Sequence, residues 1–185
     1  MGVRSPRRAL YRSRQFFLAL TNSLKPLTLE ERSAAWGHLP EPARPLYDAM
    51  PRADQRHSLR VMAALQRAGH DDPALLQAAL LHDCAKGEGH IQIWHRVALV
   101  LLKALWPALP ARWAGGSAPA RTDWRFPVWV HLHHPERGAE LVAAAGCDPL
   151  AVTLIRRHQE PLTAHTRDPS LDGLLVVLQA ADNDN

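Results

Sequence analysis

Residues 71–86 of this 185-residue chain have the sequence DDPALLQAALLHDCAK. One of the two opening aspartates can act as an N-cap, and Pro73 suits the first helical turn, where a missing N–H has no intrahelical partner. The residues that follow are almost all alanine and leucine, so the pattern predicts a strongly apolar helix that ends at Leu81. At helical spacing, His82 and Asp83 continue its apolar faces, which places two polar side chains toward the predicted core.

The remainder of the chain is also predicted to be helical, because it shows almost no period-two alternation of the kind that indicates strands. Prolines divide residues 38–52 into short helical turns and loops, and residues 107–127 are predicted to form a long loop that could cover a site. A capping box formed by Thr28 and Glu31 predicts the start of one helix. Further helices are predicted at residues 7–22, 53–68, 91–106, 135–145, 148–158 and 170–182. The fold class we expect is all-α.

Composition is that of an ordinary soluble domain, with 46% apolar and 22% charged residues. The chain has only two cysteines, Cys84 and Cys147, which excludes a disulfide-rich secreted scaffold and indicates a reducing compartment. The longest apolar segment, 91–106, contains charged residues and is too short to span a bilayer. We therefore expect a cytoplasmic protein without a transmembrane span.

The net charge of 22 − 18 = +4 is unevenly distributed. Residues 1–29 carry six cations and no acid, so the rest of the chain has 16 cations and 18 anions, a net of −2. A domain that binds a nucleic-acid duplex normally spreads Lys and Arg over its folded surface, and this body does not. The basic leader is predicted to be a solvated first helix; a secretory signal, a transit peptide and a helix on anionic lipid are alternatives, the last of which would bring residues 1–25 to a membrane surface.

Several polar side chains lie on the apolar faces of the predicted helices. They are His57, His82, Asp83, His158 and Asp182. A single core histidine is more often hydrogen-bonded to backbone, but this set is difficult to explain as scatter. A buried carboxylate without a partner is costly, and Lys86 is the only cation close in sequence to these acids. One or two shared divalent ions would resolve the difficulty, and mixed imidazole and carboxylate ligation suits Fe, Mn, Zn, Co or Ni better than Ca or Mg.

Five stretches carry these and related residues: RHSLRV at 56–61, ALLHDCAK at 79–86, HPERGAE at 134–140, IRRH at 155–158 and AAD at 180–182. Together they resemble the HD-domain metal-dependent phosphohydrolases, and the pattern is closest to that of the binuclear HD-type diadenosine tetraphosphate hydrolases. The resemblance covers residues 53–185, so we expect an HD-type metal-binding helical domain there, preceded by a basic N-terminal helical extension over 1–52. In this chain Cys84 and Ala85 stand between Asp83 and Lys86, where many relatives have Ile-Gly.

The resemblance implies a role for each site residue. The first metal would be bound by His57, His82, Asp83 and Asp182, and Asp83 would bridge to a second metal completed by His134 and His158. As catalytic residues it implies Asp83 and Lys86. Lys86 would assist at the phosphate. Apart from the resemblance, Arg137 and Arg157 lie near proposed ligands, and because arginine forks fit phosphate oxygens we expect them to bind substrate; solvated helix charges are the alternative.

Hydrolysis of a nucleotide or another small phosphate ester or anhydride by a metal-activated hydroxide is the function that this resemblance implies. The alternative is a non-catalytic HD module that binds a nucleotide or a partner protein and keeps a structural metal.

Pro135 decides which of the adjacent His133 and His134 is predicted to be the metal ligand. Only one of His133 and His134 can point inward, and a proline at the first helical position would make His134 the N-cap of the helix predicted at 135–145. His131 is either close to the ligands or exposed.

Overall fold

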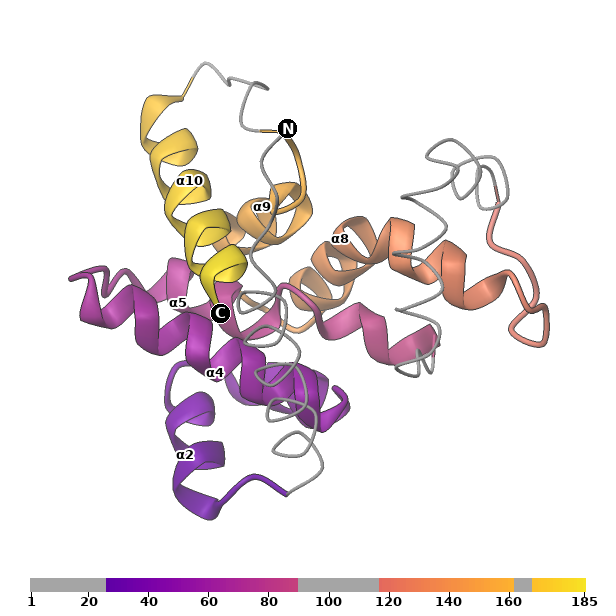
Figure 1. Ribbon diagram of the computed structural model, residues 1–185, viewed down its shortest axis with the longest axis horizontal. Coiled ribbons are helices and arrows are strands. Elements are labelled where there is room, and N and C mark those ends of the chain that lie inside the picture. Colours follow the sequence, from indigo (N-terminus) through magenta and orange to yellow (C-terminus); the bar gives the residue numbers. More distant parts are fainter. Residues whose placement is uncertain (1–25, 90–116, 162–167) are drawn as a thin grey trace, which may run out of the picture.

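The computed structural model of the protein describes residues 26–89, 117–161 and 168–185, and every regular element in these ranges is helical (Figure 1). The described elements are α2 (Leu29–Gly37), the 3₁₀ turn η1 (Glu41–Ala43), α3 (Arg44–Asp48), α4 (Arg52–Arg67), α5 (Pro73–Leu81), the 3₁₀ segment η2 (Cys84–Gly89), α8 (Phe126–Ala144), α9 (Pro149–Arg157) and α10 (Pro169–Asp184). The predicted all-α class is confirmed. The helices predicted at 7–22 and 91–106, and most of the loop predicted at 107–127, lie outside the described residues.

Local signals in the sequence determine where several helices begin. The capping box at the start of α2 is present, because Thr28 N–H donates to Glu31 Oε2 at 2.7 Å and Glu31 N–H donates to Thr28 Oγ1 at 3.1 Å. At α5 the N-cap is Asp72, whose Oδ1 accepts from the Leu75 N–H at 3.0 Å. Gly69 ends the preceding turn with a φ of 83°, a conformation that favours glycine.

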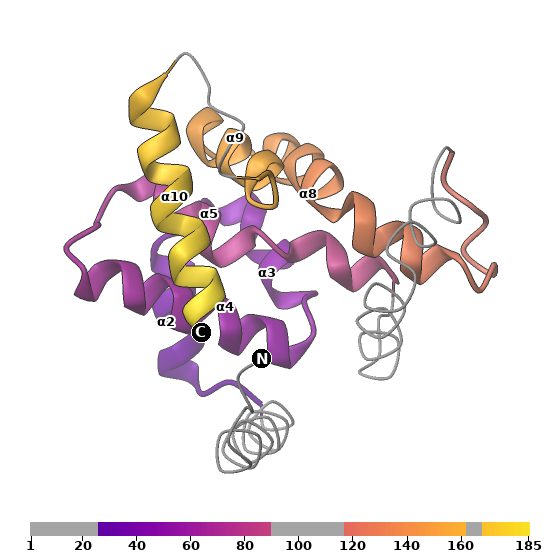
Figure 2. The same cartoon turned by 45° about the horizontal axis from the view of Figure 1, so that its top comes forward.

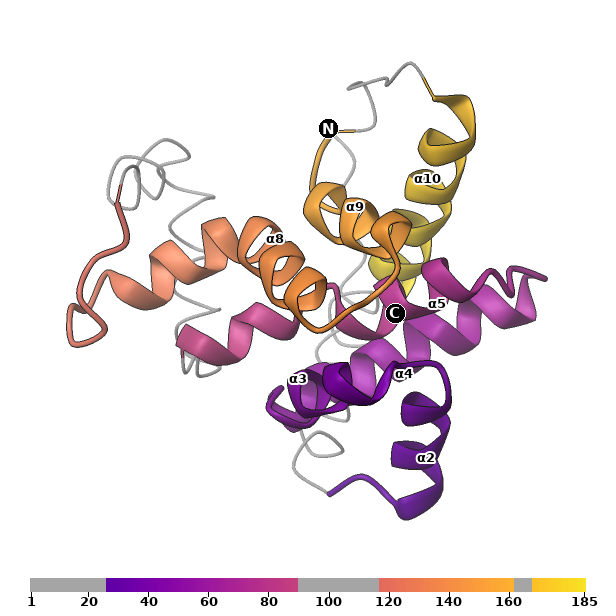
Figure 3. The same cartoon turned by 180° about the vertical axis from the view of Figure 1, so that it is seen from behind.

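Helix α5 lies in the middle of the molecule and packs against α4, α9 and α10. Its leucines Leu75, Leu80 and Leu81 are completely buried, and each contributes about 1.5–3 kcal/mol of hydrophobic stabilisation relative to an exposed side chain. Figure 3 shows α2 below α4 and α5, with α9 and α10 above them. In Figure 2, α10 crosses in front of α5 and α4. The end of α5 therefore lies where several helices meet.

Residues 26–52, the described part of the predicted extension, share the main core. Ala35, Ala43 and Tyr47 are completely buried in the same apolar cluster as α5. The Tyr47 hydroxyl donates to the Gln55 carbonyl at 3.1 Å, and Gln55 Nε2 donates to the Tyr47 carbonyl at 2.9 Å. These reciprocal bonds hold α3 against the start of α4, the helix that carries His57.

The predicted start of the helix at 135–145 is wrong. Helix α8 begins at Phe126, nine residues earlier, and contains Pro135 in its interior, while Pro127 occupies the first turn. His134 is thus a helical residue and not an N-cap. An interior proline is tolerated because the carbonyl that it leaves without an N–H partner, that of His131, accepts a bond from a side chain instead.

Among the described helices, none combines the length and the apolar character that crossing a membrane requires.

Candidate metal centre

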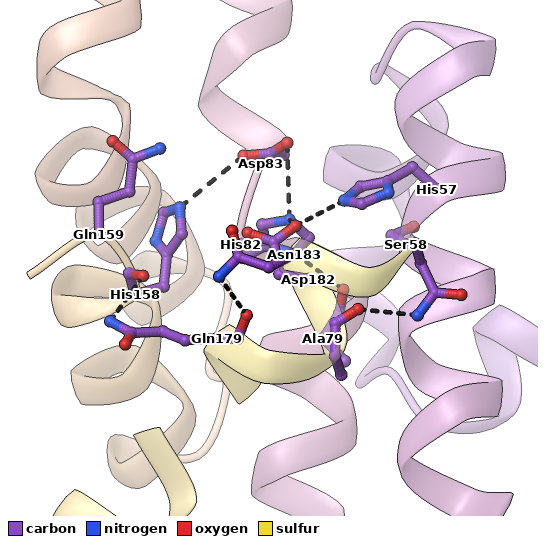
Figure 4. Close-up of polar contacts among 12 residues, drawn as sticks. His57, Ser58, Ala79, His82, Asp83, His158, Gln159, Gln179, Asp182 and Asn183 are labelled. Carbon is purple, nitrogen blue, oxygen red and sulfur yellow. Dashed lines mark hydrogen bonds and ion pairs between the residues drawn. The ribbon is translucent and has the colours of Figure 1, made fainter. Parts of the chain in front are cut away.

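The six predicted metal ligands come from five separate segments and converge at one place. Figure 4 labels five of them, all but His134. His57 lies within α4 and His134 within α8, whereas His82, Asp83 and His158 follow the last residues of α5 and α9. The sixth, Asp182, lies in the last turn of α10. Four of them, His82, Asp83, His134 and His158, are buried.

Three of the imidazoles are oriented by backbone carbonyls through their Nδ1 atoms. His82 Nδ1 lies 3.0 Å from the Ala79 carbonyl, His134 Nδ1 lies 2.7 Å from that of His131, and His158 Nδ1 lies 2.6 Å from that of Ile155. A carbonyl only accepts, so each Nδ1 carries the proton and each Nε2 of a neutral ring presents a lone pair. This is the arrangement in which protein imidazoles bind metal ions.

The helices provide those carbonyls for a local reason. The last carbonyls of an α-helix have no intrahelical N–H partner, which leaves those of Ala79 and Ile155 available at the ends of α5 and α9. Within α8 the proline at 135 has no N–H to donate to the carbonyl of His131. Each of these carbonyls lacks an intrahelical N–H partner, and each lies three residues before the inward-pointing histidine that it contacts.

A first group consists of His57, His82 and Asp83, whose ligand atoms all lie within 4.8 Å of one another. Asp182 adjoins it, because its Oδ1 lies 2.7 Å from His57 Nε2 and 3.5 Å from His82 Nε2. His82 Nε2 is also 3.5 Å from Asp83 Oδ2. This buried nitrogen has no hydrogen-bond partner at either carboxylate.

A second group consists of Asp83, His134 and His158, again within 4.8 Å. His134 Nε2 lies 3.3 Å and His158 Nε2 lies 3.9 Å from Asp83 Oδ1, and the two nitrogens are 3.3 Å apart. With both Nδ1 protons bonded to carbonyls, two lone pairs and a carboxylate oxygen face one another. Asp83 Oδ1 is buried without a hydrogen bond. A cation between these three acceptors fits their chemistry, and Asp83 contributes one oxygen to each group.

Burial and charge shift several pKa values in the centre. Burial raises the pKa of Asp83, but the charges of His82 and Lys86 outweigh it and hold this pKa well below the ordinary value. Burial opposes a lowered pKa at Asp182 as well, but the 2.7 Å hydrogen bond with His57 and the nearby His82 ring outweigh burial and lower this pKa. For His82, Asp83 and Asp182 raise the pKa against the effect of burial. For His158, burial and the His82 charge lower the pKa to about 3, so the ring is neutral near pH 7.

No family model, curated protein or solved structure matches this chain. The chemistry of the centre is therefore inferred from its donor atoms, which are imidazole nitrogens and carboxylate oxygens. Such mixed ligands suit Fe, Mn, Zn, Co and Ni.

The three residues predicted to bind substrate differ in their placement. Lys86 is part of the centre, with Nζ 2.7 Å from Asp83 Oδ2. Arg137 is paired with Glu88 at 3.1 Å and with Glu140 at 2.8 Å. Arg157 is paired with Glu160 at 2.8 Å and lies 3.7 Å from Asp172. Acidic side chains thus engage both guanidinium groups, and their contact with substrate stays a prediction.

Two glutamines at the centre were not predicted from the sequence. Gln179 Nε2 donates to the carbonyls of His158 at 3.0 Å and Glu160 at 2.8 Å, which ties α10 to the end of α9. Gln159 Nε2 lies 3.3 Å from His134 Nε2. The sequence carried a signal for Gln179, which precedes Asp182 by three residues on the same helical face. For Gln159 the only signal is its position directly after a predicted ligand.

Proposed function

We propose that this protein is a metal-dependent phosphohydrolase that acts on a nucleotide or another small phosphate ester or anhydride. The observation that carries the proposal is the position of Asp83, whose two oxygens each face a separate group of imidazoles. The resemblance of the motifs to the HD-domain phosphohydrolases supports the same reaction class. A reducing, cytoplasmic location belongs to the proposal and is supported by two free, buried cysteines, Cys84 and Cys147.

The residues present fit one or two divalent transition ions. His57, His82, Asp83 and Asp182 would hold the first, and Asp83, His134 and His158 would hold the second. When bound, such ions supply Lewis acidity, which activates water and offsets negative charge on phosphoryl oxygens.

The exposure of the proposed ligands supports one direction of approach for the proposed substrate. His82 and His134 are almost completely buried, whereas the side chains of His57 and Asp182 are 20% and 31% exposed. The first group is therefore most exposed at the side chains from α4 and α10, and we expect substrate to reach that group there. Lys86 holds its ammonium group beside Asp83, from where it can donate to an oxygen of a phosphoryl group.

The decisive test combines elemental analysis with phosphate release across a panel of nucleotides that includes dinucleoside polyphosphates. We expect bound transition metal, turnover of at least one compound, and loss of both in Asp83→Ala. The matched control is Asp71→Ala, which removes an exposed aspartate just before α5 and should change neither. Full activity of the Asp83 variant would refute the mechanism.

One observation favours a second candidate, the non-catalytic HD module with a structural metal. Both arginines predicted to bind substrate are engaged by acids, Arg137 by Glu88 and Arg157 by Glu160. This module would also bind metal, so metal content does not separate the two. Only the enzyme hydrolyses a member of the panel.

A further inference from the structure

The exposed side chain of Gln159 reaches back to the buried second group. Its Nε2 lies 3.3 Å from His134 Nε2, at the edge of the group formed by Asp83, His134 and His158. In Figure 4 the side chain stands beside the His158 ring, with the amide nitrogen turned toward Asp83. An amide from the solvent side thus closes a group of buried acceptors.

The direction of this hydrogen bond follows from the rest of the His134 ring. Its Nδ1 donates to the His131 carbonyl at 2.7 Å, so Nε2 of the neutral ring has a lone pair and can only accept. The Gln159 amide must therefore present its NH₂ group. At 3.3 Å the contact lies beyond the usual range for a strong N–H donor bond, which makes it easy to exchange for another acceptor.

We propose that Gln159 binds a phosphoryl oxygen of the ligand when an ion occupies the second group. This inference rests on the proposed function and deepens it. An ion bound by His134 would take the Nε2 lone pair that the amide now uses, and the NH₂ group would then need a new acceptor. An anionic oxygen of a phosphate ligand would supply one.

The position of Gln159 complements that of Lys86. Lys86 Nζ donates to Asp83 Oδ2, the oxygen that faces the first group, whereas Gln159 lies at the second group, which Asp83 Oδ1 faces. A phosphoryl group with three free oxygens could accept from both donors. A neutral amide also adds a donor there without the charge that a second lysine would place beside an ion.

The fold does not depend on this side chain. The backbone on both sides of Gln159 is held by Gln179, which donates to the carbonyls of His158 and Glu160. Truncation of Gln159 should therefore leave the end of α9 in place. A variant at this position tests ligand binding without the loss of the site.

The experiment measures the binding of inorganic phosphate to the full chain loaded with Mn²⁺, by titration calorimetry. The proteins are wild type, Gln159→Ala, Gln159→Glu and the control Gln66→Ala; Gln66 is half-buried and lies about 13 Å along α4 from His57. We expect wild type, Gln159→Ala and the control to bind Mn²⁺ equally, and Gln159→Glu to bind it at least as tightly because a carboxylate is also a ligand for Mn²⁺. The phosphate Kd should rise about fivefold to tenfold in Gln159→Ala, the effect of one lost hydrogen bond, and further in Gln159→Glu, where two anions meet. The control should match wild type.

An unchanged phosphate Kd in Gln159→Ala at equal metal content would overturn the inference. Loss of Mn²⁺ from that variant would also overturn it, because the amide would then support the metal and not the phosphate. If wild type binds no metal at all, the proposed function fails and this inference fails with it. The metal measurement therefore separates the two failures.

Discussion

Replacement of Pro135 by alanine should stabilise the metal-free protein and weaken its metal binding. Proline in a helix interior is about 3 kcal/mol less favourable than alanine, and Pro135 is an interior residue of α8. Alanine restores an N–H that can donate to the carbonyl of His131 along the helix. That carbonyl now accepts from His134 Nδ1 at 2.7 Å, so the new bond competes with the one that orients the ligand.

The substitution should change both the free energy of unfolding and the metal affinity. The structure has already adapted to the proline, so a gain of about 1–3 kcal/mol is expected, and each kcal/mol raises the Tm of a chain this size by about 2–4 °C. Loss of a partner that orients a ligand typically weakens metal binding about 10–100-fold. Thermal unfolding with a chelator should therefore show a higher Tm than wild type, and metal titration should show a weaker site.

The matched control is Pro127→Ala, because Pro127 lies in the first turn of the same helix, where proline breaks no hydrogen bond. This variant should bind metal as wild type does and gain no stability. If Pro135→Ala also binds metal as tightly as wild type, the His131 carbonyl does not orient His134 in the way that the distances indicate.

Two further predictions concern packing and pH. A Cβ at Gly138 would lie 3.3 Å from Ile155 Cγ2 and 3.6 Å from Cys84 Sγ, so Gly138→Val should lose about 1–3 kcal/mol in urea unfolding; wild-type stability would show that α8 can move away. His158 has a folded pKa of about 3 against an ordinary 6.5, so between these values the unfolded chain binds the extra proton and stability falls as the pH drops. Relative to neutral pH, this effect amounts to about 2 kcal/mol at pH 5. Metal-free His158→Gln should lack this component, and equal pH slopes for the two proteins would contradict the assignment.

Periodicity predicted much of the candidate centre because its signal is local. A polar residue at the i+3, i+4 and i+7 spacing of an apolar face must point toward the core, and His57, His82 and His158 were found in this way. The structure places all three together with Asp83 and Asp182. The starts of α2 and α5 could be predicted for the same reason, because the capping residues Thr28 and Asp72 lie within three residues of the N–H groups that they bond.

The start of α8 could not be predicted from local signals. Proline near a helical pattern usually marks the first turn, and His133–His134 before Pro135 matched that rule. The rule failed because His134 itself provides the donor that the proline lacks, a compensation that only the folded helix shows. The ion pairs of Arg137 with Glu88 and of Arg157 with Asp172 depend on tertiary contacts in the same way.

The charge balance of the centre changes which group most needs an ion. From the sequence, Lys86 alone was too little positive charge for Asp83 and Asp182. In the structure the two carboxylates raise the pKa of His82, and Lys86 Nζ donates to Asp83 Oδ2 at 2.7 Å. Asp182 Oδ1 also lies 2.7 Å from His57 Nε2, so both acids of the first group have polar partners within the protein. In the second group the pKa of His158 is lowered to about 3, and Asp83 Oδ1 is buried without a hydrogen bond. The argument for a bound cation is therefore strongest at Asp83, His134 and His158, the group that Gln159 covers.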